Sequence, residues 1–306
     1  MSTLSQYAED YLQLRRTFGH KMRHADRLLP RFVTYLEAIG AETVTVETTL
    51  AWAQSAGHLS VRAQCMAVVR GYARFLVGID PRTEVPPIGL LPYPNRRRPP
   101  FIYSPDDIAA LMAAARKTLE GPLRATTYET LIGLLAVTGM RVGEVINLNR
   151  ADVDLAEGVL TVRMTKFCKS REVPLHRTTV EALVLYARKR DELQRRPSAS
   201  FFIYDSGKPM QYPQVQRTFR RIVNSAGVGA GSPLSPHIHD LRHSFAVRTL
   251  IDWYRKGENV EACLPRLSTY LGHIDPHATY WYLSAVPELL ALAAKRLEST
   301  QEVYRV

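Results

Sequence analysis

A proline-rich stretch divides the chain and limits the folds open to it. Residues 81–100 contain seven of the nineteen prolines in the 306-residue sequence. Because proline lacks a backbone N–H and has a fixed φ, this stretch cannot form a helix or a central strand. A chain of this length also exceeds what one hydrophobic core usually organises. The sequence therefore predicts two domains, residues 1–80 and 101–306, joined by a linker at 81–100.

The first domain has the pattern of a small helical bundle. Apolar residues recur at three- and four-residue spacing in four segments that glycines separate. These segments are 5–16, 22–39, 46–54 and 60–77. In the last segment Arg62, Arg70 and Arg74 lie opposite the apolar stripe.

The second domain is predicted to be mainly α-helical with a small antiparallel β-sheet at its side. Ser104 is a good N-cap, followed by proline and two carboxylates that suit the positive end of a helix. Segments 159–165 and 172–175 flank a polar turn, which is typical of a hairpin. Helices are expected at 125–138, 178–195, 214–226, 240–256, 260–271, 276–284 and 288–297.

The charge balance points to a nucleic-acid partner. Lysine and arginine number 40 against 29 acidic residues, a net charge of +11, and 32 of the 40 are arginine. Guanidinium groups suit bidentate contacts with phosphate, although a compositional bias of the source genome would give the same ratio. On the linker, Arg96, Arg97 and Arg98 could follow a phosphate backbone or form a solvated patch.

Cysteine usage and hydropathy favour a cytoplasmic protein without a membrane partner. Cys65, Cys168 and Cys263 form no C-x-x-C pair, so neither a disulfide framework nor a cysteine zinc site is expected. Residues 1–16 lack a signal-peptide core, and no apolar run approaches the ~18 residues of a membrane span.

Five of the nine histidines fall in residues 237–277, which allows three interpretations. His239 and His243, one helical turn apart, could belong to a metal site, but the glutamate of the zincin pattern is absent. The pair His239-Asp240 could belong to a metal phosphohydrolase, but further ligands upstream are absent. Alternatively, histidines and arginines together bind phosphate. The other members of the cluster are His237, His273 and His277.

Two arginines stand in settings that suit an anion. His239 and Arg242, three residues apart, project from the same side of a predicted helix. Arg141 follows a glycine turn at a helix start, where backbone amides favour anions, and Glu144 could hold its guanidinium. Such an Arg–Glu pair is also common on helix surfaces, where it stabilises little.

Residues 270–282, Y-L-G-H-I-D-P-H-A-T-Y-W-Y, complete a resemblance to the tyrosine recombinase (phage integrase) family. Its signature is T-G-x-R-x-x-E, a hairpin lysine, H-x-x-R, and L-G-H with a tyrosine nine residues later. The long charged segment 253–265 is similar to a transposon-associated branch. The matching residues, in family order, are Arg141, Glu144, Lys166, His239, Arg242, His273 and Tyr282.

The resemblance implies that Arg141, Arg242 and His273 bind the phosphate. Guanidinium groups can stabilise the charge of a phosphoryl transition state without a metal. Glu144 would support Arg141. No metal is therefore expected.

The remaining matching residues would transfer protons and take part in forming and breaking the bonds to phosphorus. Tyr282 would attack phosphorus while His239 accepts its proton, and Lys166 would protonate the departing 5′-hydroxyl. The covalent 3′-phosphotyrosine would keep the bond energy, so no ATP is expected.

Four neighbouring residues compete for these roles or adjoin them. Tyr280 is a second hydroxyl near Tyr282, which is preferred on spacing alone. Lys169 is expected to contact the DNA backbone rather than act as the acid. His243, common in the family without being counted as catalytic, is expected to pack on its helix, and His237 to lie beside the phosphate.

The sequence is interpreted as a prokaryotic, nucleoid-associated site-specific recombinase that integrates, excises or transposes a mobile element. Alternatives are a replicon-dimer resolving recombinase, a type IB topoisomerase-like enzyme or a catalytically idle accessory protein. A homotetramer, alone or with companion recombinases, would act on double-stranded DNA at two core sites. Residues 287–306 would pack on their own domain or, as in the family, dock into a neighbouring subunit; the second is preferred. Candidate DNA-backbone contacts are Arg62, Arg70, Arg74, Arg96, Arg97, Arg98 and Lys169.

Overall fold

The computed structural model of the chain forms two compact units, Met1–Arg97 and Arg98–Val306. None of the helices in the described ranges combines the length and apolar character that a bilayer crossing needs. The residues that the structure describes are 3–91, 98–163, 170–194, 198–272, 277–285, 288–292 and 294.

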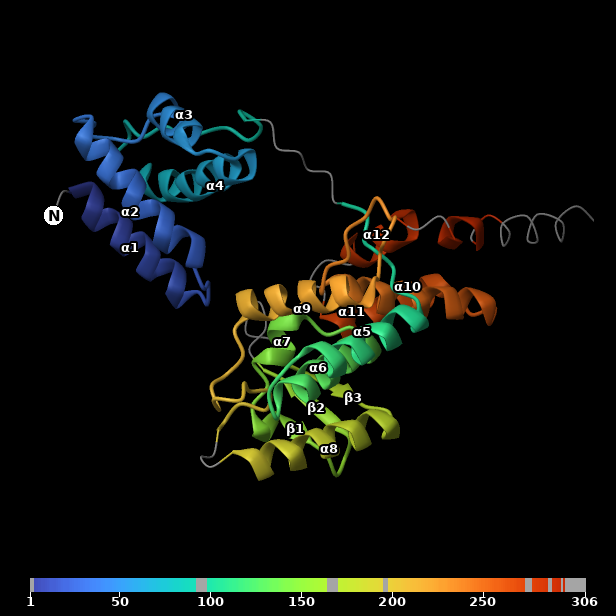
Figure 1. The fold of residues 1–306 in the computed structure, drawn as a ribbon. Helices are drawn as coiled ribbons and strands as arrows, with labels where there is room; N and C mark the ends of the chain where they lie inside the picture. Colours follow the sequence, from blue (N-terminus) through green and yellow to red (C-terminus); the bar gives the residue numbers. More distant parts are fainter. Residues whose placement is uncertain are drawn as a thin grey trace, which may run out of the picture. The chain divides into compact units, whose positions relative to one another are not determined.

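The first unit is the predicted helical bundle, drawn from blue to teal in Figure 1. Its helices are α1 (Thr3–Thr17), α2 (Arg23–Ala38), α3 (Val46–Ser55) and α4 (Leu59–Leu76). Phe32 and Leu36 of α2 pack with Val69 and Tyr72 of α4, and all four are fully buried. The Tyr72 hydroxyl donates to the carbonyl of Leu4 at 2.7 Å, which ties α4 to the start of α1.

Part of the proline-rich stretch packs on this first unit. The carboxylate of Glu84 accepts a hydrogen bond from the backbone of Val46 at 2.7 Å, at the start of α3. Arg70 of α4 donates to the carbonyls of Pro86 and Pro87 at 2.7 and 2.9 Å. The chain is therefore held to the bundle as far as residue 87.

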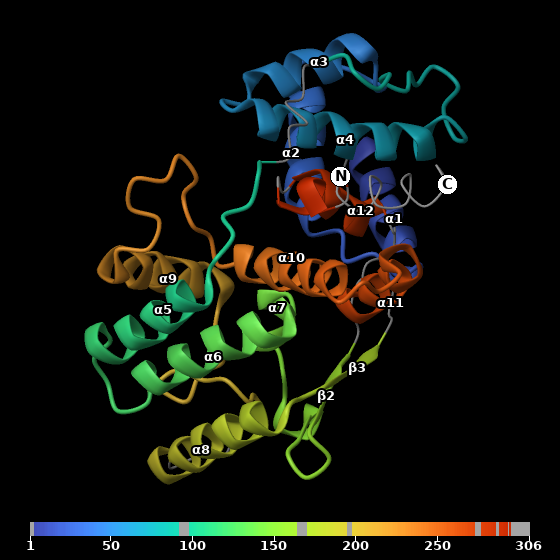
Figure 2. The same ribbon diagram turned by 90° about the vertical axis from the view of Figure 1, so that its right-hand side faces the viewer.

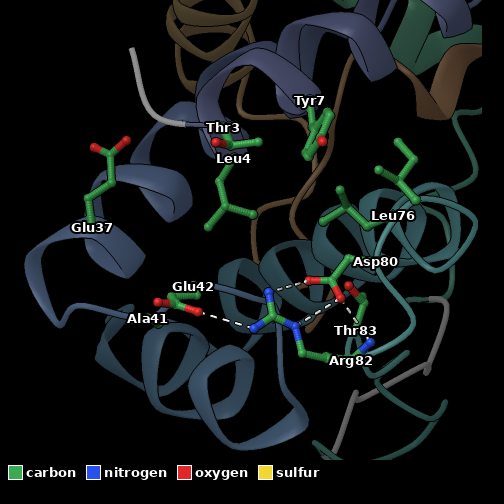
Figure 3. A pocket seen from close by; sticks show the side chains of 11 residues that line it. Thr3, Leu4, Tyr7, Glu37, Ala41, Glu42, Leu76, Asp80, Arg82 and Thr83 are labelled. Atoms are coloured by element: carbon green, nitrogen blue, oxygen red, sulfur yellow. Dashed lines mark hydrogen bonds and ion pairs between the residues drawn. The ribbon is translucent and has the colours of Figure 1, made fainter.

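The first unit also contains a cavity of about 640 Å³ between α1, the end of α2 and the segment after α4 (Figure 3). Glu42 and Asp80 line it, and Arg82 donates to both carboxylates. Three of the charged side chains that line the cavity thus pair with one another. None of the predicted site residues lines this cavity.

The second unit confirms the predicted fold class, mainly α with a small antiparallel sheet. Helix α6 lies at its centre, packed against α5, α8 and α10 (Figure 1). Leu131, Ile132, Leu134 and Leu135 of α6 are buried, because residues 131–137 of this helix are all apolar or glycine. The elements are α5 (Pro105–Thr118), α6 (Arg124–Thr138), α7 (Val142–Ile146), η1 (Arg150–Asp152), β1 (Val153–Asp154), β2 (Val159–Val162), β3 (Arg171–Pro174), α8 (Arg177–Leu193), α9 (Tyr212–Ala226), α10 (Asp240–Arg255), α11 (Val260–Leu271) and α12 (His277–Ala285).

The sheet contains one strand more than the predicted hairpin. Its order is β1-β2-β3, all antiparallel, with Leu160 of β2 opposite Val173 of β3. Both side chains are fully buried and point into the core. β1 has only two residues, too few to show an alternating pattern in the sequence. Figure 2 shows β2 and β3 extending toward α11.

A second core joins the last helices of this unit. Val247 and Leu250 of α10 pack with Leu264 of α11 and Tyr282 of α12. This cluster brings the histidines and arginines of α10 to the end of α11 and to the tyrosine of α12.

Candidate active site

Arg141 lies at the junction of α6 and α7. Helix α6 ends at Gly139, which has a left-handed φ of 59°, and Arg141 is the N-cap of α7. A β-carbon at position 139 would collide with the Phe245 ring, so only glycine fits both the backbone conformation and the space. This is the structural reason for the glycine turn before the arginine.

Both terminal nitrogens of Arg141 are bonded within the protein. Nη1 donates to Glu144 Oε1 at 2.8 Å, and Nη2 donates to the carbonyl of Gly272 at 2.8 Å. The backbone N–H of Arg141 also donates to Glu144, at 3.0 Å. The Arg141 side chain is 36% exposed while that of Glu144 is only 10% exposed. The pair is therefore not a solvated surface ion pair, and its guanidinium is held in one direction.

Glu144 also pairs with an arginine that lies outside the motifs of the sequence. Arg171, the first residue of β3, donates to the two Glu144 oxygens at 3.2 and 2.8 Å. Burial by itself raises the pKa of Glu144, but the hydrogen bonds from Arg171 and Arg141 lower it to about 2. The carboxylate stays ionised and holds two guanidinium groups.

Arg242 is almost fully buried, with 2% of the residue exposed. Its Nη1 donates to the carbonyl of Gly139 at 2.8 Å, and its Nη2 to that of Leu271 at 2.7 Å. Burial, with the nearby charge of Arg141, lowers the pKa of Arg242 to about 10. Arg242 is still protonated at neutral pH, so a positive charge lies in a nearly water-free position.

The end of helix α11 aligns the three arginines. The carbonyls of Tyr270, Leu271 and Gly272 are consecutive, and each accepts a hydrogen bond from a different arginine: Arg171, Arg242 and Arg141. The last carbonyls of a helix lack partners within it and form its negative end. The C-terminus of α11 therefore gathers three cations from β3, α10 and the start of α7.

Tyr282 is directed into the same region from α12. Only 2% of the residue is exposed, and its hydroxyl lies 2.9 Å from Nδ1 of His243. Tyr282 also interacts electrostatically with the buried guanidinium of Arg242. Tyr280, in contrast, is 45% exposed. The two candidate hydroxyls therefore differ in setting: that of Tyr282 is buried beside His243 and Arg242, and that of Tyr280 belongs to an exposed side chain.

His239 and His243 form a pair on α10. His239 is the N-cap residue of this helix and is exposed. Its ring packs edge-on against that of His243, with 5.0 Å between the centroids. The Tyr282 hydroxyl bonds to a nitrogen of His243, a residue that the sequence predicts only to pack on its helix.

A sequence model of the phage integrase family matches residues 102–288, more than half of the chain. The chain belongs to the phage integrase family. A putative integrase/recombinase of Sinorhizobium fredii, y4rB, is 42% identical over 314 aligned residues, with 99% of each chain covered. The tyrosine recombinase XerD of Pseudomonas aeruginosa is 32% identical and covers 81% of this chain and 78% of its own. Members of this tyrosine recombinase family break and rejoin DNA.

Solved structures share the fold. The Tn1549 transposon integrase, in complex with transposon right end DNA, superposes with a TM-score of 0.68 at 16% identity, covering 96% of this chain and 98% of that chain. A lambda integrase dimer bound to a core site gives a TM-score of 0.57 at 18% identity, covering 90% and 96%.

The structure describes only some of the predicted DNA contacts of this chain. Arg74 is exposed on α4, whereas Arg62 donates to the carbonyl of Ala56 at 2.7 Å. Arg70 is bonded to the proline-rich segment, as described above, and Arg98 donates to the carbonyl of Ser235. The residues predicted for the site that lie outside the described ranges are Arg96, Arg97, Lys166, Lys169 and His273.

Two further predictions concern this unit. Within the described ranges, no three of its histidine, cysteine and acidic side chains come together in a way that could hold a metal ion. In the tail segment, Leu289 is buried in the cluster of α10, α11 and α12, and Glu288 accepts from Arg255 at 3.0 Å. The described start of the tail thus packs on its own unit.

Proposed function

We propose that this integrase cleaves a DNA strand by attack of Tyr282 on a phosphodiester. The observation that carries the proposal is the position of the Tyr282 hydroxyl, 2.9 Å from an imidazole nitrogen and close to the buried Arg242. A phenol with an ordinary pKa of about 10 needs both a proton acceptor and a nearby cation to become a nucleophile at neutral pH. This site offers both.

The arginines would stabilise the transition state. A phosphodiester under attack carries additional negative charge, which fixed cations stabilise best when they need no rearrangement. Arg141 and Arg242 are each held by two hydrogen bonds. Because these guanidinium groups already supply positive charge, we propose that the reaction needs no metal.

The remaining family residues complete the proposed reaction. His239, whose ring packs against that of His243, would accept the proton that leaves Tyr282. His273, which directly follows Gly272 in the sequence, would donate a hydrogen bond to the phosphate. Lys166 would give a proton to the departing 5′-oxygen. The tyrosine–phosphorus bond forms as the bond to the 5′-oxygen breaks. A 5′-hydroxyl of another strand then reverses the step, so that rejoining needs no ATP.

The relatives support a role on mobile DNA. The chain is similar over almost its full length to a protein named a putative integrase/recombinase, and it shares the fold of a transposon integrase. We propose site-specific integration, excision or transposition by four copies on two double-stranded core sites, with or without companion recombinases. Similarity to XerD makes resolution of replicon dimers the second candidate.

The experiment is covalent capture of DNA. Purified integrase is incubated with sheared, nicked DNA of its source genome, and protein-linked fragments are recovered after full denaturation and sequenced. We expect recovery of fragments that share a common site. Absence of any denaturation-resistant DNA with the wild-type chain would refute the proposed function.

Two tyrosine variants identify the nucleophile. Tyr282→Phe removes the hydroxyl with little change in shape and should abolish capture while DNA binding persists. Tyr280→Phe is the matched control and should capture DNA as the wild type does. Capture that survives Tyr282→Phe but is lost with Tyr280→Phe would transfer the role to Tyr280.

A further inference from the structure

Tyr103 lies in the short segment between the proline-rich linker and α5. The residue is fully buried in the main core of the second unit. Its ring packs edge-on against those of Phe101 and Phe219, with 4.9 and 6.5 Å between the centroids. Burial, together with the charge of Asp240, raises the pKa of Tyr103 far above its ordinary value. The hydroxyl is therefore protonated at neutral pH and can donate a hydrogen bond.

Tyr103 is hydrogen-bonded at two points to the start of α10. Its hydroxyl donates to the carbonyl of His237 at 3.0 Å, and its backbone N–H donates to the Ser244 hydroxyl at 2.8 Å. Ser244 is fully buried, and its hydroxyl donates to the carbonyl of Asp240 at 2.8 Å. The two bonds of Tyr103 therefore attach it both to the residues before α10 and to the first turn of this helix.

The turn that Tyr103 holds contains the N-cap residue of α10, His239. The carbonyl of His237 also accepts from the backbone N–H of Asp240 at 3.0 Å, and the Asp240 carboxylate accepts from the backbone N–H of His237 at 2.8 Å. These reciprocal bonds close the turn. The backbone N–H of Arg242 donates to the carbonyl of His239 at 3.1 Å. The positions of His239 and Arg242 therefore depend on the position of this turn.

A shift of the start of α10 would displace a buried cation. Arg242 is 2% exposed, and it interacts electrostatically with Tyr282. Fixed charges stabilise a transition state only when they are already in place, and a displacement of about 1 Å can lower a rate about 100-fold. A contact that fixes the start of α10 therefore also fixes the cation beside Tyr282.

Resting on the proposed function, we propose that Tyr103 is a positioning residue for strand cleavage, which holds the turn before α10 and thereby fixes His239 and Arg242 relative to the scissile phosphate. Because Tyr103 is fully buried, it acts through these two residues and not by contact with DNA. The segment by which the chain enters the second unit thus supports the catalytic groups.

The test compares two variants that each lose one buried hydroxyl. Tyr103→Phe removes the bond to His237 and keeps the ring. Tyr72→Phe is the matched control in the first unit, because Tyr72 is equally buried and its hydroxyl also donates to a backbone carbonyl, that of Leu4 at 2.7 Å. Each variant should lower the melting temperature by about 2–8 °C.

Cleavage separates the two variants. It is measured in single turnover at saturating concentrations of a nicked duplex that carries the captured site, and DNA affinity is measured by gel shift. Tyr103→Phe should cleave about ten-fold or more slowly than the wild type, with a dissociation constant within about two-fold. Tyr72→Phe should cleave at the wild-type rate. Ser244→Ala, which removes the bond to the Tyr103 backbone, is the second variant if Tyr103→Phe does not fold.

A substrate with a methylphosphonate at the cleaved position distinguishes positioning of a cation from loss of folded protein. One charged non-bridging oxygen is replaced there by a methyl group, so the transition state depends less on Arg242. The ratio of the wild-type rate to the Tyr103→Phe rate should therefore be smaller on this substrate, by about three-fold or more. A loss of folded protein would lower cleavage of both substrates equally and leave the ratio unchanged.

The outcomes separate this inference from the proposed function. If the wild type forms covalent DNA and Tyr103→Phe cleaves within about two-fold of its rate, or is slowed equally on both substrates, Tyr103 does not position the site. Failure of both Tyr103→Phe and Ser244→Ala to fold would make the contact purely structural and also overturn the inference. If the wild type forms no covalent DNA, the proposed function itself is wrong, and the inference is refuted with it.

Discussion

Removal of the Arg171 side chain should destabilise the second unit strongly, although sequence motifs did not select this residue. Arg171 donates one hydrogen bond to the carbonyl of Tyr270 and two to Glu144. Its side chain is 14% exposed and that of Glu144 10%. Arg171→Met keeps most of the side-chain length and removes all three bonds.

The expected magnitude follows from the burial of this pair. Loss of one partner of a buried ion pair costs about 3–5 kcal/mol. Because Arg141 continues to pair with Glu144, we expect the lower end, about 3 kcal/mol. For a unit of this size that corresponds to a fall in melting temperature of about 6–12 °C.

The assay is thermal unfolding of the full chain, followed by circular dichroism. Arg177→Met is the matched control, because Arg177 pairs with Glu181 across one helical turn while the two side chains are 89% and 58% exposed. An exposed pair of this kind stabilises by about 0.5 kcal/mol or less. The control should therefore melt within about 2 °C of the wild type.

The pH dependence gives an independent check. The pKa of folded Glu144, about 2, lies below its ordinary value of 4.5. Its contribution to stability is therefore complete above the ordinary pKa and is lost as the pH falls from there toward 2. Without Arg171 the folded pKa rises, so the stability gap between wild type and Arg171→Met should be widest near neutral pH and narrow in acid. A gap below about 0.5 kcal/mol, or one independent of pH, would refute this reasoning.

Three further predictions concern the same site and the contacts with the DNA backbone. Gly272→Ala should lower the free energy of unfolding in urea by about 1–2 kcal/mol, because Gly272 has a φ of +67° and a β-carbon would lie 2.9 Å from Arg171 Nη1; unchanged stability would contradict this. Cleavage should proceed at the same rate in excess EDTA, and loss of activity there would revive a metal role for the histidines. Arg74→Ala should make the plot of the logarithm of the DNA-binding constant against the logarithm of the salt concentration less steep, by about one. Cleavage at saturating DNA should be unchanged. An unchanged slope would show that Arg74 does not contact the DNA.

The helical periods and motif spacings of the sequence predicted much of the site, because they depend on local geometry. Ser104 caps α5 as expected, accepting from the backbone of Asp107 at 3.0 Å. The i, i+3 spacing likewise placed Arg141 and Glu144 in contact. Such relations need only a helix, and the helix is visible in the apolar pattern.

Contacts between distant segments could not be predicted in the same way. The bond from Arg171 to Tyr270 spans 99 residues, and a backbone carbonyl has no sequence signature. One signal was present: Arg171 lies two residues before the buried Val173, hence on the same face of β3, where an arginine needs a partner. For His243, the helical period indicated on which face of α10 the side chain lies. Its contact with Tyr282 depends on how α12 packs against α10, and the helical period does not show that packing.

At the end of α11 positive charge exceeds negative charge. This excess makes the stability of the protein depend on whether DNA is bound. Three guanidinium groups meet one carboxylate there, and the charge of Arg141 is among the causes that lower the pKa of Arg242. A bound phosphate would relieve this repulsion, and any ligand that binds only the folded state stabilises it by mass action. The DNA-free chain should then be the form that unfolds and is degraded first. Molecules that are not bound to a DNA site would therefore be degraded faster than molecules that are bound to one.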